Sequence, residues 1–363
     1  MLAWSGDSAV NRHRRPEARV GALKRVDEYL LSIVIKALNE EQHIRRCIES
    51  ALRALQEVGG SGEVILADSL STDATVDLAK QYPVRIVQLV NPADRSCGAG
   101  AQLGYQYANG QFVYVLDGDM ELLPGFMTAA LVKLRNEPRL AGVAGLVEEA
   151  IVANEAFVGR ARRGDTSTAA SSARALNMGG LYRADAIREV GYLTDRNLHS
   201  FEELDLGLRL AQRGWSLERI ALPSVKHYGP TVTSASLMRR RWRTRYAWGH
   251  GQLLRASFGA GRGWRAIAGL RVLRPQAFTM AAWSLLLFVS MGGVSLIAAT
   301  HAAALMVSAW AGIWLVVASA KRSFSAATYS LSAWHVGLAG LVCGFIKPVR
   351  VSPEVLVDGR ELQ

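Results

Sequence analysis

The chain has 363 residues, enough for one large domain or two ordinary ones, and a formal net charge of +11. Its three cysteines have neither the spacing of a metal site nor that of a disulfide framework, which excludes a cysteine-based scaffold and is typical of a reducing compartment. Residues 1–28 are a basic tail without the apolar core of a secretory signal peptide, and we expect this tail to be mobile.

Short apolar runs alternate with helical patterns from about residue 30 to about residue 225. Residues 31–35 (LSIVI) are a β-branched run, and the stretch after them has apolar residues at helical spacing. Further strands are expected at residues 63–68 (EVILAD), 84–89 (VRIVQL) and 112–117 (FVYVLD), with helical patterns between them. Alternation of this kind predicts an α/β domain with a mostly parallel sheet and helices on both faces.

Two of these strands end in an aspartate. Asp68 ends one strand, and Asp117 ends another and is followed at once by Gly118 and Asp119. A single Asp-Gly-Asp triplet is common in turns. In a parallel sheet, however, both strand ends project from the same edge, where the ligands of open α/β sheets bind. Carboxylates at that edge suit a hard cation together with substrate phosphates, so we favour a nucleotide site over a turn.

The positive charge is concentrated in one segment. Ten arginines and no acid lie between Arg239 and Arg274, interleaved with aromatic residues, whereas the rest of the chain is nearly neutral. We interpret residues 237–274 as a helical segment at the surface of anionic lipid. Nucleic-acid binding is the competing interpretation. The apolar sequence that follows makes it the weaker one, and we expect no nucleic-acid partner.

Residues 275–320 contain no Asp, Glu, Lys or Arg. A membrane core about 30 Å thick requires roughly 20 apolar residues per helix. We therefore expect two spans, near residues 277–299 and 302–320, joined at Thr300 and His301. Basic residues on both flanks of this hairpin place its two ends in the cytoplasm.

The remaining C-terminal sequence allows more than one interpretation. A third apolar stretch near residues 329–346 could span the membrane, re-enter it or lie at its surface. Residues 275–347 are thus expected to be membrane helices, and residues 348–363 a tail. Residues 29–236 are then the soluble domain, which faces the cytoplasm from the inner (cytoplasmic) membrane.

Five motifs between residues 30 and 250 occur in the order known from one protein family. They read SIVIKALNEE, ILADSLSTDATVDLA, YVLDGDMELLPG, the stretch from MGGLYRADAIREVG to FEELDLGLRLAQRGW, and LPSVKHYGP. In these motifs the sequence resembles glycosyltransferase family 2, whose members use nucleotide-sugars, invert the anomeric configuration and have the GT-A fold. The resemblance implies a GT-A catalytic domain at residues 29–236 followed by membrane helices.

The resemblance also implies roles for residues at the strand ends. The family's nucleotide-binding positions match Ala37, Glu40, Asp68, Asp117 and Gly118. Asp117 would lie near the ribose, and Asp119 would bind a divalent metal, Mg²⁺ or Mn²⁺, that neutralises the leaving diphosphate. His227 matches a further metal ligand, and a strand-end histidine in contact with solvent is an equal alternative.

The acceptor-side motif implies a catalytic base. Glu203 stands where the family has an aspartate that takes the proton of the acceptor hydroxyl, and Glu202 precedes it. A glutamate can accept a proton, but its extra methylene moves the carboxylate by about 1.5 Å. The competing interpretation is a helix whose first turn is rich in acids because of the macrodipole. Other departures from the family are Lys36 for a proline, Leu38 for a tyrosine and Leu70 for a glycine.

These features together predict a membrane-bound enzyme of cell-surface polysaccharide or glycolipid synthesis. Met238 replaces the glutamine of processive members, so we expect transfer of one sugar from a nucleoside-diphosphate donor, most commonly UDP in this family, to a lipid-linked acceptor. Arg241, Trp242 and Arg245 are expected at the acceptor side of the membrane interface. Transfer to polyprenyl phosphate itself is one alternative, since a phosphate acceptor needs no base. A non-catalytic nucleotide-sugar-binding scaffold is another, and the sequence indicates no oligomeric state.

Overall fold

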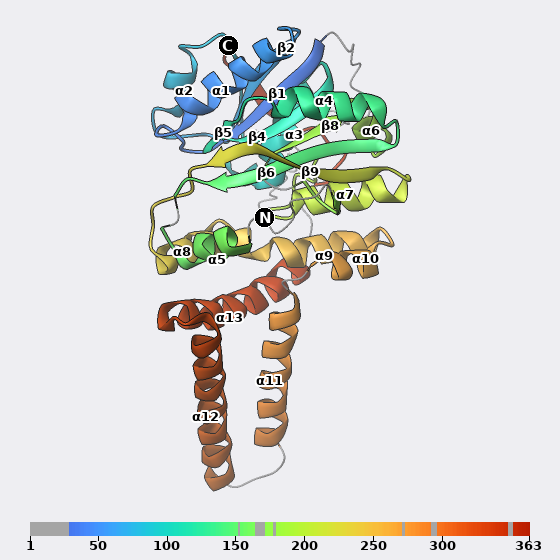
Figure 1. Ribbon diagram of the computed structural model, residues 1–363. Coiled ribbons are helices and arrows are strands. Elements are labelled where there is room, and N and C mark those ends of the chain that lie inside the picture. Colours follow the sequence, from blue (N-terminus) through green and yellow to red (C-terminus); the bar gives the residue numbers. More distant parts are fainter. Residues whose placement is uncertain are drawn as a thin grey trace, which may run out of the picture.

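The computed structural model describes residues 29–151, 153–163, 171–176, 179–270, 273–291, 296–347 and 351–363. The expected mobile tail, residues 1–28, lies outside them. A layered α/β domain forms one end of the molecule (Figure 1). Its strands are β1 (Tyr29–Ala37), β2 (Gly62–Asp68), β3 (Arg85–Leu89), β4 (Gly110–Asp117), β5 (Met120–Leu122), β6 (Leu140–Glu149), β7 (Ser171–Ala173), β8 (Gly180–Arg183), β9 (Ser216–His227) and β10 (Gly359–Glu361).

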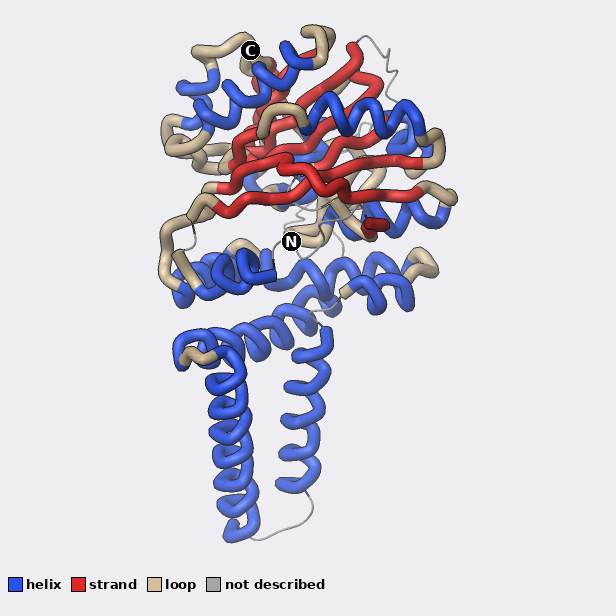
Figure 2. Tube along the Cα trace, viewed as in Figure 1, coloured by secondary structure: helices blue, strands red, loops and turns tan. Residues whose placement is uncertain are grey.

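The strands of the described residues form one sheet, in the order β10-β3-β2-β1-β4-β8-β6-β9-β5, with β7 paired to β9. Figure 2 shows the sheet as the centre of the α/β domain. The four strands predicted first, β3, β2, β1 and β4, are all parallel to their neighbours in this set. Beyond β4 the sheet is mixed, because β8 pairs antiparallel with both β4 and β6, while β6 and β9 are parallel. The parallel half therefore carries the predicted strand ends.

Helices cover both faces of the sheet, and the side chains of β1 show why. Leu31, Ile33 and Ile35 pack into one core with α1 (Ile44–Glu57) and α4 (Phe126–Asn136), whereas Val34 packs into the other core. That second core contains α3 (Cys97–Tyr107), α6 (Ala184–Glu189) and α7 (Glu202–Gln212). Because successive strand residues point to opposite faces, a strand buried on both sides reads as a continuous apolar run. The strand ends are thereby held on a rigid frame.

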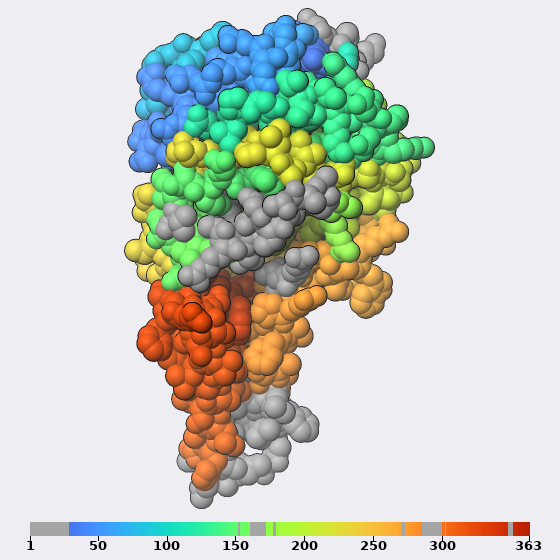
Figure 3. All heavy atoms as spheres, viewed as in Figure 1, coloured from blue at the N-terminus to red at the C-terminus, as the bar shows by residue number. Residues whose placement is uncertain are grey.

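A second layer of helices separates the α/β domain from the apolar part of the chain. It contains α8 (Ser234–Arg243), the short helix η3 (Tyr246–Trp248), α9 (Gly249–Gly259) and α10 (Gly263–Gly269). Beyond it, α11 (Leu273–Met291) and α12 (Leu296–Lys321) run side by side away from the sheet (Figure 1). In the space-filling view they protrude as a narrow stalk (Figure 3).

Among the described residues, two segments are long and apolar enough to cross a membrane, Ala303–Lys321 in α12 and Phe324–Ile346, which is α13. In α12 the side chains of Leu305, Val307 and Val316 are 72%, 70% and 68% exposed. Apolar side chains exposed in this way along one helix suit lipid better than water. Membrane association is the simplest interpretation of these helices.

The connection expected at Thr300 and His301 is wrong, because both residues lie inside α12. Helix α11 ends at Met291 and α12 begins at Leu296. The junction between the two expected spans is therefore N-terminal to Thr300, whereas the span expected near residues 302–320 lies within α12.

Helix α13, the third apolar stretch, lies across the near end of the α11–α12 pair and packs along η3 and α9 (Figure 1). Glycines allow this approach: a Cβ on Gly340 would lie 2.1 Å from the Ala247 carbonyl oxygen, and one on Gly344 would lie 2.1 Å from that of Trp248. Small residues of this kind let helix backbones approach closely. This stretch is therefore packed along one side against the second layer of helices.

Residues 351–363, which were expected to be a simple tail, fold back onto the α/β domain. Their strand β10 pairs antiparallel with β3. Strand β3 would otherwise be an edge of the sheet, and the unpaired backbone groups of an edge strand accept a further strand. The chain end therefore lies on the same side of the stalk as the sheet.

Candidate active site

The carboxyl ends of β1, β2 and β4 meet at one edge of the sheet, as the strand pattern predicts. Ala37 is opposite Asp68 in the β1–β2 ladder, and Asp117 ends β4 on the other side of β1. A Cβ on Gly118 would lie 2.9 Å from Cγ of Glu40 and 3.3 Å from Cβ of Ala37, so this close approach needs glycine. The predicted nucleotide-binding residues are therefore neighbours in space.

Asp68 is fully buried, and hydrogen bonds hold its carboxylate. Gln88 Nε2 donates to Oδ2 at 2.8 Å, and the backbone N–H of Ser71 donates to the same oxygen at 3.0 Å. Leu70 has a φ of 61°, in the left-handed region that favours glycine, and Arg95 donates to its carbonyl oxygen. Leu70 thus has a backbone conformation that is typical of glycine, and because Asp68 is fully buried, a ligand can contact it only after a change in these surroundings.

Lys36 lies among the carboxylates of the site. Its Nζ is 3.1 Å from Asp117 Oδ1 and 3.0 Å from Glu202 Oε1. Burial alone would lower the pKa of Lys36, but the charges of Asp117 and then Glu202 raise it well above its ordinary value. Lys36 therefore stays protonated and neutralises part of the cluster. From the sequence it was only a departure from a proline, because its partner Glu202 is 166 residues away.

Glu202 and Glu203 occupy the first turn of α7, as the pattern indicates. Both side chains line a small pocket with Asp117 and Tyr182, but the ion pair of Lys36 is with Glu202. Loss of solvent, and next the charge of Glu202, raise the pKa of Glu203 to about 8. Glu203 is therefore the carboxylate placed to take up a proton, while Glu202 is held in an ion pair.

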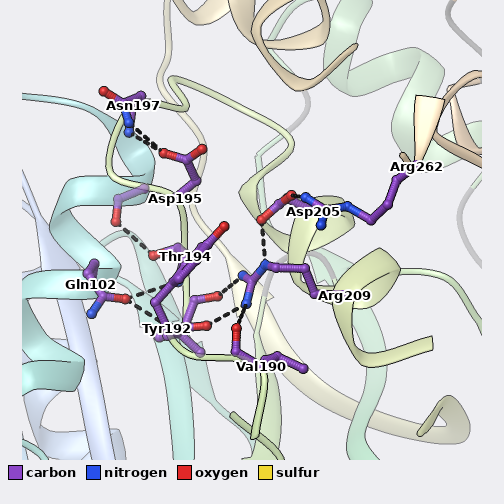
Figure 4. A network of polar contacts seen from close by, with 11 residues as sticks. Gln102, Val190, Tyr192, Thr194, Asp195, Asn197, Asp205, Arg209 and Arg262 are labelled. Atoms are coloured by element: carbon purple, nitrogen blue, oxygen red, sulfur yellow. Dashed lines mark hydrogen bonds and ion pairs between the residues drawn. The ribbon is translucent and has the colours of Figure 1, made fainter. Parts of the chain in front are cut away.

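A buried polar network fixes the start of α7 against its surroundings (Figure 4). Arg209 Nε donates to Asp205 Oδ2 at 2.8 Å, and its other nitrogens donate to the carbonyl oxygens of Tyr192 and Leu193. Arg262, between α9 and α10, donates to Asp205 Oδ1 at 3.2 Å. Asp205 and Arg209 are thus an i, i+4 pair that anchors the helix carrying Glu203 to the neighbouring loop and to the second layer.

Asp119 and His227, the expected metal ligands, lie side by side. His227 Nε2 is 3.3 Å from Asp119 Oδ2, and its Nδ1 is 2.7 Å from Oε2 of Glu149. Glu149 is opposite His227 in the β6–β9 ladder. Burial would lower the pKa of His227, but hydrogen bonds with Asp119 and then Glu149 raise it to about 9. The sequence analysis missed Glu149, because no local motif connects it with the histidine.

These groups fit a hard divalent cation that shares its coordination with phosphates. Among the residues that the structure describes, no set of three or more His, Cys, Asp or Glu could hold a metal ion by itself. Cations such as Mg²⁺ often bind through one or two protein ligands and complete their shell with substrate oxygens. A ligating histidine commonly has its second nitrogen hydrogen-bonded to a carboxylate, as His227 has with Glu149. The negative charge that keeps His227 protonated would favour a cation in the proton's place.

Arg241, Trp242 and Arg245, expected at the membrane interface, lie between the α/β domain and α13. Arg241 Nη1 is 3.5 Å from the hydroxyl oxygen of Tyr329 in α13. Trp242 packs edge-on against Trp248, and the Arg245 guanidinium lies 5.6 Å from the centre of a Trp248 ring. Aromatic and cation–π contacts of this kind hold α8 and η3 together.

A groove of about 560 Å³ runs between α8 and α13. Its walls include Met238, Arg239 and Trp242 of α8 and Thr328, Tyr329, Ser332 and Val336 of α13. Arg240 of the same helix acts on the strand-end site through its charge: burial and then the charge of Asp119 raise the pKa of Glu40 to about 8, and Arg240 opposes this shift. Helix α8 therefore lines the groove and contributes positive charge toward the carboxylates.

Comparisons with known proteins point to one family. The family model described as "Glycosyl transferase family 2" matches residues 32–171. The chain is 33% identical over 97 residues to dodecaprenyl-phosphate galacturonate synthase of Rhizobium johnstonii, which covers 25% of this chain and 28% of that protein. It is 23% identical over 204 residues to dolichyl N-acetyl-alpha-D-glucosaminyl phosphate 3-beta-D-2,3-diacetamido-2,3-dideoxy-beta-D-glucuronosyltransferase of Methanococcus voltae, which covers 52% of this chain and 63% of that protein. The chain thus spans between 28% and 63% of the length of these two relatives.

Among solved structures, the chain is similar to mannosyltransferase PcManGT from Pyrobaculum calidifontis in complex with GDP-Man and Mn²⁺. The TM-score is 0.52 at 17% identity, and the similarity covers 90% of this chain and 91% of that one. At this level of identity the similarity shows the fold.

Proposed function

Because residues 32–171 form a glycosyltransferase family 2 domain with a GT-A fold, we propose that the protein is an inverting glycosyltransferase. It transfers one sugar from a nucleoside-diphosphate donor, with UDP as the first candidate, to a lipid-linked acceptor of cell-surface polysaccharide or glycolipid synthesis. The main support is the convergence of Asp117, the Asp119–His227 pair and Glu203 at one sheet edge. A scaffold without activity would have no need for this arrangement.

On this proposal, the strand ends bind the donor. Ala37, Glu40 and Asp68 contact the nucleoside, and Asp117 with Gly118 lies near the ribose. Asp119 and His227 would hold a divalent cation, Mg²⁺ or Mn²⁺, which when bound neutralises charge on the departing diphosphate. Glu149 keeps the second nitrogen of His227 occupied and so orients its ring.

Glu203 acts as the base in this proposal. It takes the proton of an acceptor hydroxyl while that oxygen attacks the anomeric carbon on the face opposite the diphosphate. The new carbon–oxygen bond forms as the bond to the diphosphate breaks, and the electron pair leaves with the nucleoside diphosphate. A pKa of about 8 makes Glu203 a stronger base than an ordinary glutamate and still lets it ionise near neutral pH.

The lipid part of the acceptor is proposed to lie in the groove between α8 and α13. Met238, Trp242 and Val336 offer apolar walls to a prenyl chain, and Arg239 offers a cation to a phosphate near them. The names of the two relatives refer to dodecaprenyl and dolichyl phosphates, which agrees with such an acceptor. Transfer to polyprenyl phosphate itself is the second candidate, since the arginines of α8 suit a phosphate acceptor equally well.

The apolar helices also support a location for the enzyme. Lys321 and Arg322 follow the stalk and the arginine-rich segment precedes it, so the positive-inside rule places the α/β domain on the cytoplasmic side of the inner membrane. In this arrangement α12 enters the membrane with α11, and α13 lies at the surface beneath the groove. Nucleic-acid binding is disfavoured, because Arg241, Arg245 and Arg262 are engaged with aromatic rings or with Asp205.

Calorimetric binding of UDP and GDP to the detergent-solubilised protein, with and without Mn²⁺, tests the donor site. Binding that requires metal and disappears in Asp119→Ala would support the proposal, and absence of binding for both nucleotides would count against it. A transfer assay then compares a prenyl-linked acceptor with the corresponding soluble oligosaccharide. Equal turnover of the two would overturn the lipid-linked assignment.

A further inference from the structure

The C-terminal segment, residues 351–363, is attached along the edge of the sheet that lies next to the donor site. Strand β10 pairs with β3, and Arg85 Nη2 donates to Oε2 of Glu361 at 3.1 Å. Beyond the strand, the backbone N–H of Leu362 donates to the carbonyl oxygen of Ile86, and the N–H of Ile86 donates to the carbonyl oxygen of Gln363, both at 2.8 Å. The end of the chain is thus an additional strand of the nucleotide-binding half.

The same segment also holds the loop that precedes the catalytic helix. Arg196 Nη1 donates to the carbonyl oxygen of Leu356 at 2.6 Å, and Asn197 Nδ2 donates to that of Val351 at 2.8 Å. Gln106 of α3 exchanges two hydrogen bonds with the backbone of Val357, at 2.9 and 2.7 Å. Attachment at several points keeps β10 in a fixed register.

That register places three side chains in one row across three strands. Arg360 is opposite Gln88 in the β10–β3 ladder, and Gln88 is opposite Asp68 in the β3–β2 ladder. Arg360 donates through Nε and Nη2 to Oε1 of Gln88, and Gln88 Nε2 donates to Oδ2 of Asp68 at 2.8 Å. A continuous chain of hydrogen bonds therefore runs from the C-terminal strand to the buried carboxylate.

The donor-to-acceptor direction of these hydrogen bonds has a chemical consequence. A glutamine amide accepts at one end and donates at the other. Because Arg360 has no acceptor, it holds Oε1 of Gln88 toward itself and directs the amino group to Asp68. That bond and the one from Ser71 both go to Oδ2 at 3.0 Å or less, whereas the hydrogen bond from Ser71 N–H to Oδ1 is longer, at 3.3 Å. Oδ1 is therefore the less engaged oxygen, and once the surroundings of the buried carboxylate change it can accept from a donor group of a ligand, such as the ring N–H of uracil or guanine.

We propose that Arg360 is a positioning residue of the donor site: acting through Gln88, it fixes the carboxylate of Asp68 for the nucleobase. This inference rests on the proposed role of Asp68 in nucleotide binding. On this inference, residues 351–363 help to determine which nucleobase the catalytic domain binds. Nucleobases with a ring N–H should bind better than cytosine, which lacks one.

The test compares Arg360→Ala and Gln88→Ala with Arg85→Ala, in the full-length protein. Arg85→Ala removes the ion pair between β3 and Glu361 of β10, and it leaves the side-chain row Arg360–Gln88–Asp68 in place. It is therefore the matched control. Calorimetry gives the Kd of UDP and GDP, and amide hydrogen exchange reports on the Ser71 N–H, which donates to Asp68. Loss of one hydrogen bond of this type predicts about threefold to tenfold weaker nucleotide binding in both row variants.

We expect Arg360→Ala to weaken nucleotide binding and to speed amide exchange at Ser71, with an unchanged melting temperature. Arg360→Lys should recover part of the binding and part of the exchange protection. Arg85→Ala should change nucleotide affinity by less than about twofold. Equal effects of Arg360→Ala and Arg85→Ala would mean that strand attachment alone matters, and would overturn the inference. If the parent protein binds neither nucleotide, the proposed function fails, but hydrogen exchange at Ser71 still tests the positioning role. Exchange that is faster in Arg360→Ala than in Arg85→Ala supports this role, and equal exchange in the two variants refutes it.

Discussion

Lys36 Nζ and Glu202 Oε1 lie 3.0 Å apart, and this ion pair separates the roles of two adjacent glutamates. The charge of Glu202 is compensated, so Glu203 carries the raised pKa and faces the pocket with Asp117. The lysine thus compensates the charges of Asp117 and Glu202, whereas Glu203 is the carboxylate that takes up a proton.

Lys36→Met should destabilise the protein and reduce its activity, because it leaves the charges of Glu202 and Asp117 uncompensated. The side chains of Lys36 and Glu202 are only 16% and 4% exposed. Removal of one partner of such a pair costs about 3 kcal/mol in the free energy of unfolding. Urea denaturation measures this loss. The double variant Lys36→Met/Glu202→Gln removes both charges and should recover a large part of it. If the double variant were no more stable than the single one, the ion pair would not explain the effect.

Glu203→Gln should lower kcat by about 10²–10⁴-fold with little change in the Kd of the donor, since glutamine cannot accept the proton. In the parent enzyme kcat/KM should rise with pH and level off above about 8, as Glu203 ionises. Glu40 also has a pKa raised to about 8, so Glu40→Gln is the control and should keep the rise with pH. A Glu203→Gln enzyme with nearly full activity would favour the phosphate acceptor, which needs no base.

Stability should change with pH in the opposite sense to activity. Folding raises the pKa of Glu203 from its ordinary value of 4.5 to about 8. Between these values the folded state binds more protons than the unfolded state, so this group's contribution to stability is full below about pH 4.5 and is lost as the pH rises to about 8. Glu203→Gln lacks this loss. Relative to the parent, the variant should gain melting temperature between pH 5 and pH 8, and an equal offset at every pH would speak against the assignment.

Glu149→Gln should weaken metal binding by about tenfold to a hundredfold, because Glu149 orients the ring of His227. Asp119→Ala should abolish metal-dependent nucleotide binding. The matched control is Glu121→Gln, since Glu121 is paired with Tyr228 and Arg53 instead.

The pKa of His227 is about 9 without metal, so a proton competes with the cation and the apparent affinity for Mn²⁺ should increase up to that pH. Calorimetry at several pH values measures both effects, and metal binding that is independent of pH would exclude His227 as a ligand.

Much of the donor half could be predicted from the sequence, because its information is local. A β-branched run that ends in an aspartate gives both the strand and the position of the carboxylate, and β1, β2 and β4 place Ala37, Asp68 and Asp117 together as expected. Gly118 is likewise explained by its neighbours Glu40 and Ala37.

The residues that were missed act through partners distant in the chain. Lys36, Glu149 and Arg360 each become meaningful only through a contact 166, 78 or 272 residues away. Composition also does not distinguish a helix that crosses a membrane from one that lies on it, and α13 passes the same length and hydropathy test as α12. Its packing against η3 and α9 depends on the glycines that fit there.

Filling the groove between α8 and α13 should impair use of a prenyl-linked acceptor and spare the donor site. Ser332 lines the groove, so Ser332→Trp places an indole where the prenyl chain is proposed to lie. We expect the KM for the lipid acceptor to rise about tenfold or more, while metal-dependent UDP binding stays unchanged. Leu305→Trp is the control, because Leu305 is 72% exposed on α12 away from the groove. An equal rise in KM for both variants would indicate a general effect on membrane insertion. A normal KM in a stably folded Ser332→Trp enzyme would place the acceptor elsewhere, because an occupied groove cannot also hold a prenyl chain.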